Sequence, residues 1–189
     1  HNVTGGTQSA LDGLNAAVAD AAVTLWKTGI SGPEADSVLS GLATYHPAIM
    51  NVITYDPDGT VLAAEPASAQ ELIGQNLYKY DIVRTSITIK EPAMSDLFTL
   101  AEGGDGSVIT YPVFSADGNF TGVLSVAFSP YALIAPVSEE AMGRAPYTYT
   151  VAQTDGRLLY HPDPELVGKQ TFNETVFTDF PEILELARQ

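Results

Sequence analysis

The chain has 189 residues, of which 45% are hydrophobic and 16% charged, so it can bury a core in one ordinary domain or two small ones. Eight lysines and arginines stand against 23 aspartates and glutamates, and the net charge of -15 argues against nucleic acid or an anionic membrane surface as a partner. Cysteine is absent, which excludes disulfides, thiolate zinc sites and a cysteine nucleophile.

Two helices are expected before residue 47. Apolar residues recur every three or four positions and predict a helix over residues 8–27. This apolar stripe consists of Leu11, Leu14, Val18, Ala21 and Leu25. Pro33 suits a helix start, and the second helix should end near Tyr45 because Pro47 disfavours a helical conformation before it. The stripe can pack on its own domain or on a partner subunit, and both interpretations stay open.

The pattern after residue 47 is typical of an antiparallel sheet. Two hairpins are predicted from β-branched and aromatic runs that flank turns rich in Asp and Gly. Their strands are residues 51–55 with 60–64, and 107–114 with 120–128. Between the hairpins we expect a short helical piece at 69–73, a helix at 82–89 and a fifth strand at 93–98. The fold class is therefore α+β, with one five-stranded antiparallel sheet.

A partial internal repeat predicts a second, related lobe. Asp58-Gly59 followed by Glu71 to Gln75 recurs as Asp155-Gly156 followed by Glu165 to Lys169. The second copy should begin with strands at 147–153 and 157–160, and a helix is expected at 181–189. We therefore expect three parts. They are an N-terminal helical region (1–46), a first lobe (47–140) and an incomplete second lobe (146–189).

The cationic side chains of the first lobe are close together in the sequence. Between residues 47 and 140 they are Lys79, Arg84 and Lys90 alone, against twelve carboxylates. This clustering favours a pocket wall at 78–90 for a small anionic or carboxylate-bearing ligand. Arg84 is the expected anchor, because a guanidinium group holds a carboxylate with two parallel hydrogen bonds.

Two tyrosines beside this cluster extend the expected site. Tyr78 and Tyr80 can donate their hydroxyl groups next to Arg84. The alternative is that the cations lie on a solvated helix face and pair with Asp81 or Glu91. Both interpretations of the segment stay open.

Three residues of the sheet are further candidates for ligand contacts. Asp96 either binds an amine or ends its strand, and Tyr111 either contacts the ligand or fills the core. Ser125 depends on the same choice of face, since alternate residues of a strand point to opposite sides of the sheet.

The sequence has few residues for catalysis. Histidine occurs only at positions 1, 46 and 161, and no serine hydrolase, zinc protease or phosphate-loop motif is present. We expect no enzyme activity, no cofactor and no metal site in this chain.

The order of several motifs resembles the double Cache (PAS-like) family of extracytoplasmic sensors. After the long helix come Glu71-Leu72-Ile73-Gly74-Gln75-Asn76, Tyr111-Pro112-Val113-Phe114, Asp117-Gly118 and Gly122-Val123-Leu124-Ser125-Val126. The run from Arg157 to Gly168 is similar to the start of that family's second lobe. The resemblance implies the ectodomain of a membrane-anchored histidine kinase or chemotaxis transducer, on the extracytoplasmic face of the membrane. It also implies a ligand site in the first lobe, between the sheet and the segment that joins its second and third strands.

Two departures from the family pattern narrow the expected ligand. The amino-acid-binding members hold the ligand's ammonium group with an Asp on the last strand, where this chain has Ala127. They also use a Tyr-Arg-Trp pattern on the connecting segment, whereas Trp26 lies on the first helix. A carboxylate without an amine, or a neutral ligand, is therefore expected. The competing hypothesis is a surface or assembly module that dimerises through its N-terminal helix without a ligand.

Overall fold

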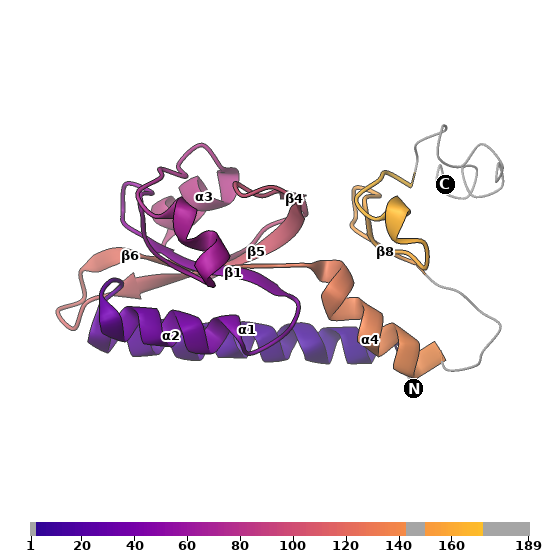
Figure 1. Cartoon of the computed structure of the whole chain (residues 1–189), viewed down its shortest axis with the longest axis horizontal. Helices are drawn as coiled ribbons and strands as arrows, with labels where there is room; N and C mark the ends of the chain where they lie inside the picture. Colours follow the sequence, from indigo (N-terminus) through magenta and orange to yellow (C-terminus); the bar gives the residue numbers. More distant parts are fainter. Residues whose placement is uncertain (1–2, 143–149, 172–189) are drawn as a thin grey trace.

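The computed structural model describes residues 3–142 and 150–171 (Figure 1). Two helices cover one face of a six-stranded antiparallel sheet, and a third helix with its flanking loops covers the other face. The helices are α1 (Val3–Thr28), α2 (Pro33–Ala43), α3 (Asp81–Ile89) and α4 (Pro130–Met142), with a 3-10 helix η1 (Ala67–Leu72). Among the described residues, no helix is both long and apolar enough to cross a membrane.

The sheet has the strand order β2-β1-β6-β5-β3, and the short strand β4 pairs with β5 beyond the end of β3. The strands are β1 (Ile49–Tyr55), β2 (Val61–Glu65), β3 (Ala93–Met94), β4 (Phe98–Thr99), β5 (Asp105–Phe114) and β6 (Phe120–Phe128). Both predicted hairpins and the α+β class are confirmed.

The predicted strand at 93–98 is wrong as a single element. Met94 pairs with Ile109 and Phe98 with Gly106, so four steps along this segment match three steps along β5. The extra residue forms a bulge that divides the segment into β3 and β4.

The apolar stripe of α1 packs on its own sheet, which settles the alternative that the sequence left open. Leu14, Val18 and Leu25 are completely buried, and they share one core with residues of α2 and the sheet. The sheet side of this core includes Val113, Leu124 and Val126. Burial of so many apolar side chains makes α1 an integral part of the first lobe's core.

The sequence did not predict α4, which contains Pro136 in its interior. Proline removes one backbone donor and disfavours the helical conformation in the residue before it, so Pro136 hid the helix. The side chains of α4 instead find tertiary partners: Leu133 and Ile134 are buried. Glu139 and Glu140 also belong to this helix.

The internal repeat is confirmed in the described part of the second lobe (150–171). It contains β7 (Val151–Ala152), β8 (Leu158–Tyr160) and the 3-10 helix η2 (Pro164–Leu166). The amide of Gly74 donates a hydrogen bond of 2.9 Å to the carbonyl oxygen of Val61. The amide of the matching Gly168 donates one of 2.8 Å to the carbonyl oxygen of Leu158. The predicted strand residues 147–149 and the predicted helix at 181–189 lie outside the described residues.

Candidate ligand-binding site

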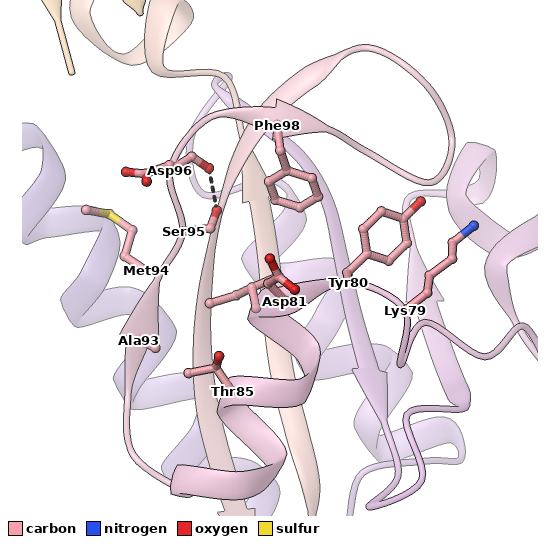
Figure 2. A pocket seen from close by; sticks show the side chains of 10 residues that line it. Lys79, Tyr80, Asp81, Thr85, Ala93, Met94, Ser95, Asp96 and Phe98 are labelled. Atoms are coloured by element: carbon pink, nitrogen blue, oxygen red, sulfur yellow. Dashed lines mark hydrogen bonds between the residues drawn. The ribbon is translucent and has the colours of Figure 1, made fainter. Parts of the chain in front are cut away.

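An open cavity of about 510 Å³ lies between the start of α3 and the sheet edge at β3 (Figure 2). We call it the outer cavity. Its lining residues are Lys79, Tyr80, Asp81, Ile82, Thr85, Ala93, Met94, Ser95, Asp96 and Phe98. The cavity therefore lies between the sheet and the connection from β2 to β3, and its wall combines apolar side chains with a few polar groups, as small-molecule sites do.

A narrower inner cavity of about 40 Å³ reaches from there to the face of the sheet. The two cavities share Tyr80, Ile82 and Phe98 as lining residues. The rings of Tyr80 and Phe98 lie 5.7 Å apart between their centroids, at an angle of 47°. Ser125 and Ala127 of β6 line the inner cavity from the sheet. Tyr80, Ile82 and Phe98 therefore lie where the two cavities adjoin.

The charged side chains of the two cavities differ in how they are paired. Asp81 forms an ion pair with Arg84, and the carboxylate of Glu102 accepts a hydrogen bond from the buried Asn51. Lys79 places its Nζ 5.1 Å from the centre of the Tyr80 ring, a cation–π contact. Within residues 3–142 and 150–171, neither Lys79 nor Asp96 has an ion-pair partner. One free cation and one free carboxylate thus line the outer cavity.

Residues 9–130, more than half of the chain, match the family described as HK/GC/Chemotaxis protein-like, sensor domain. The chain belongs to this sensor-domain family. Its resemblance to double Cache sensors is confirmed by this match and by the fold. No curated protein sequence matches it significantly.

Solved structures support the fold of the sensor domain. An extracellular ligand binding receptor from Desulfohalobium retbaense is 25% identical with a TM-score of 0.82. The match covers 99% of this chain and 34% of that one, so the present chain spans about a third of its length. The ligand-binding domain of the Pseudomonas aeruginosa chemoreceptor PctC, in complex with GABA, is 19% identical with a TM-score of 0.63, and the match covers 95% of this chain and 78% of that one.

A third structure gives the same result. The ligand-binding domain of the Pseudomonas fluorescens chemoreceptor CtaA, in complex with L-isoleucine, is 21% identical with a TM-score of 0.65. The match covers 90% of this chain and 68% of that one. At these identities, CtaA and PctC show that the fold is shared.

Three of the six predicted site residues of the sensor domain lie at the two cavities. Tyr80 lines both, Asp96 lines the outer cavity, and Ser125 lines the inner one. They come from the start of α3, the bulge after β3 and the middle of β6. Ser125 is 5% exposed, and its hydroxyl group has no hydrogen-bond partner in the described part of the chain.

Arg84 does not line either cavity, which corrects its predicted position as the anchor of the pocket wall. Its guanidinium group pairs with Asp81 one helical turn earlier and donates a hydrogen bond of 2.8 Å to the carbonyl oxygen of Lys79. These contacts hold Arg84 on the outer face of α3, with 44% of its side chain exposed. The alternative of a solvated helix face therefore describes Arg84. Tyr78 also lies outside both cavities and is exposed.

Tyr111 is on the opposite face of the sheet from Ser125's cavity, which corrects its expected place in the pocket. Its hydroxyl group donates a hydrogen bond of 3.1 Å to Asn15 Oδ1 on α1. Strand alternation explains the difference, because Tyr111 packs against the helical core that also contains Val113.

Sequence reasoning missed the contact between Asn51 and Glu102 at the inner cavity. Asn51 is 4% exposed in β1, and a buried asparagine in a strand indicates a polar partner nearby. The partner lies in the turn between β4 and β5, which the sequence pattern does not connect with β1. In the described ranges, no group of three or more histidine, aspartate or glutamate side chains is arranged to hold a metal ion.

Proposed function

We propose that this chain is the extracytoplasmic ligand-binding region of a membrane-anchored signalling receptor, of the histidine kinase or chemotaxis transducer type. The observation that carries the proposal is the outer cavity of about 510 Å³, which continues past Tyr80 and Phe98 toward Ser125. A cavity of this volume accommodates a small metabolite. Membership of the sensor-domain family supports a role in signal detection.

The proposed ligand is a small carboxylate-bearing molecule that also carries an amine. This departs from the sequence expectation of a carboxylate without an amine, because the carboxylate of Asp96 lies in a segment that lines the outer cavity. Lys79 and Asp96 provide the two free charges of opposite sign in the outer cavity. Figure 2 shows them on different sides of the cavity, Lys79 before α3 and Asp96 after β3. Ala127 lies in the inner cavity without a carboxylate, so Asp96 replaces the family's strand aspartate as the amine partner in this proposal. A ligand with separated charged groups suits this arrangement.

The competing assembly module has less support, because the apolar stripe of α1 that would mediate it is buried in the chain's own core. A homodimer through the N-terminal helix remains a prediction. It would have to use another face of α1, such as the side where Ala16 and Asp20 line a shallow groove with α2. We propose no enzyme activity for this chain.

Thermal unfolding with three matched compounds tests the proposed ligand. The compounds are 4-aminobutyrate, butyrate without the amine and butylamine without the carboxylate. At about 100 times the dissociation constant, a ligand adds about 2.7 kcal/mol of stability, which corresponds to a rise in Tm of roughly 5–10 °C for a chain of this size. We expect 4-aminobutyrate to raise Tm more than either partial analogue.

Variants of Lys79 and Asp96 test which of the two side chains binds which charged group of the ligand. Lys79→Ala should remove the dependence on the carboxylate, and Asp96→Asn the dependence on the amine. Lys27→Ala is the matched control for loss of a positive charge, because Lys27 lines neither cavity. It should respond like the wild type. An unchanged response in Lys79→Ala would overturn the assignment, as would a response to none of the three compounds.

A further inference from the structure

A hydrogen bond joins the wall of the outer cavity to the second lobe. The backbone amide of Leu97 donates to Gln153 Oε1 at 2.7 Å. Leu97 lies between Asp96 and Phe98, which both line the outer cavity. A side chain of the second lobe therefore contacts the short segment that carries two of the cavity's lining groups.

The bulge between β3 and β4 explains why this amide needs a distant partner. Ser95 still pairs with β5, because its amide donates to the carbonyl oxygen of Val108 at 2.9 Å. The chain then leaves the β-ladder, and the amide of Leu97 finds no partner on β5. Leu97 as a whole is 5% exposed, and a buried amide without a partner is costly. Gln153 supplies the missing acceptor.

The turn between β7 and β8 holds Gln153 in place. Its amide donates to the carbonyl oxygen of Arg157 at 2.8 Å, and its carbonyl oxygen accepts from Gly156 at 2.9 Å. Its Nε2 lies 3.5 Å from Asp155 Oδ1. Nε2 of Gln153 is a donor and faces the Asp155 carboxylate, while Oε1 is an acceptor and faces the amide of Leu97. Both contacts therefore require the same orientation of the Gln153 side-chain amide.

The internal repeat provides a comparison within the same chain. Asp56 holds the position in the first copy that Gln153 holds in the second. Asp56 Oδ1 accepts hydrogen bonds of 2.9 Å from Asp58 and Thr60, so this side chain stays within its own turn. In the second copy, Asp155 Oδ1 accepts the hydrogen bond from Arg157 instead. The longer Gln153 is thereby free to reach the first lobe.

A second contact lies on the same side of the second lobe. Gly168 packs close to Asp105 at the start of β5, and a Cβ atom at Gly168 would lie 3.0 Å from Asp105 Oδ2. The ring of Tyr160 stacks on Tyr131 of α4, with 5.5 Å between their centroids. Figure 1 shows the second lobe beside the end of the sheet where β4 lies. The link from Gln153 is thus part of a packed contact between the lobes.

We infer that Gln153 is a positioning residue for the ligand cavity, which fixes the segment from Asp96 to Phe98 and couples that segment to the second lobe. The inference rests on the proposed function, in which the outer cavity binds the ligand. A ligand that displaces Phe98 or draws on Asp96 must then move the hydrogen-bonded turn of the second lobe or break the bond from Leu97. The coupling free energy resides in that hydrogen bond and its surrounding contacts.

Amide hydrogen exchange without any ligand tests the link independently of the proposed function. In Gln153→Ala, the amide of Leu97 should exchange about three- to tenfold faster than in the wild type, as expected for loss of one hydrogen bond. Gln153→Glu keeps an acceptor oxygen but replaces the contact of Nε2 with Asp155 by repulsion between two carboxylates, so it should retain only part of the protection. Gln170→Ala removes a half-buried glutamine from the same lobe and should leave Leu97 unchanged. Equal exchange in Gln153→Ala and the wild type would overturn the inference.

A second arm tests the coupling. Phe98→Leu changes the cavity wall, and it should alter exchange at the amides of Gly156 and Arg157 at least twofold in the wild-type background. The same change should have a clearly smaller effect on these amides when it is made in Gln153→Ala, because only the contacts at Gly168 and Tyr160 then remain. An equal response in both backgrounds would mean that the lobes communicate without Gln153, and it would overturn the coupling. Neither experiment uses 4-aminobutyrate or any other ligand. Failure of the Gln153 inference is therefore distinguishable from failure of the ligand proposal.

Discussion

Tyr55 is the largest side chain that is completely buried among the described residues, and its hydroxyl group shares a hydrogen bond of 2.8 Å with Ser86 Oγ. Burial raises the pKa of Tyr55 well above its ordinary value of 10.0, although the bond from Ser86 partly opposes this. The pair joins β1 to α3, the helix whose start lines the outer cavity. A single side chain thus helps to fix the helix that positions Tyr80 and Asp81.

Tyr55→Phe should lower the free energy of unfolding by about 1 kcal/mol at pH 7, because Ser86 keeps its bond to the carbonyl oxygen of Val83. The sign changes at alkaline pH. With a raised pKa in the folded state, the unfolded chain loses the Tyr55 proton first, so the wild type loses stability above pH 10 while the variant does not pay this cost. Urea unfolding should show equal stabilities near roughly pH 11. A difference that is independent of pH would contradict the raised pKa.

At the scale of elements, the sheet depends on close approach between β1 and β6. Gly122 of β6 has φ 152°, and a Cβ atom there would lie 2.2 Å from the carbonyl oxygen of Tyr55. Backbone atoms cannot move aside as the end of a flexible side chain can. Glycine is therefore required at this position for the strands to pair.

Gly122→Ala should destabilise the domain by at least about 3 kcal/mol, because it combines a backbone clash with a strained φ. Gly118→Ala is the matched control. Gly118 has φ 80°, and a Cβ atom there would have no atom of the described residues within 4 Å, so only the strain of about 1–2 kcal/mol applies. Denaturant unfolding of both variants measures the difference. Similar costs would show that the strands separate easily to admit the methyl group.

Elements with a local signal were predictable, and those that depend on distant partners were not. The Asp-Gly turns and the periodic stripe of α1 identified two hairpins and a long helix, because turn geometry and helical amphipathicity are written into neighbouring residues. α4 was missed because Pro136 opposes a helix locally, while its buried Leu133 and Ile134 are stabilised by tertiary contacts. The bulge after β3 was missed because register against β5 is not a local property.

At the scale of the whole molecule, α1 is a structural layer of the first lobe. Leu25 is completely buried in the shared core, whereas Val23 on the same helix is 48% exposed. Any movement of α1 relative to the sheet would have to rearrange a close-packed core, which favours two discrete packings over a continuous slide.

Leu25→Ala should lower the free energy of unfolding by about 2–5 kcal/mol, since it leaves a cavity between α1 and the sheet. Val23→Ala, two residues earlier on the exposed side, should cost less than about 0.5 kcal/mol. Urea unfolding compares the two variants directly. If Leu25→Ala cost no more than Val23→Ala, the packing of α1 on the sheet would be contradicted.

The sequence by itself determined the fold class, the two hairpins and the internal repeat, because each depends on local periodicity or on turn residues. The clustering of cations in the sequence indicated the segment near which the cavity lies. Only the tertiary structure decided which charged residues line the cavity. Arg84 satisfies its guanidinium group on Asp81 and nearby carbonyl groups of its own segment, which leaves Lys79 as the free cation. The link from Gln153 to Leu97 spans 56 residues of sequence, and no local pattern records a hydrogen bond between lobes. Side-chain direction and pairing depend on which surfaces the packed chain brings together, and this is why folding was needed to define the site.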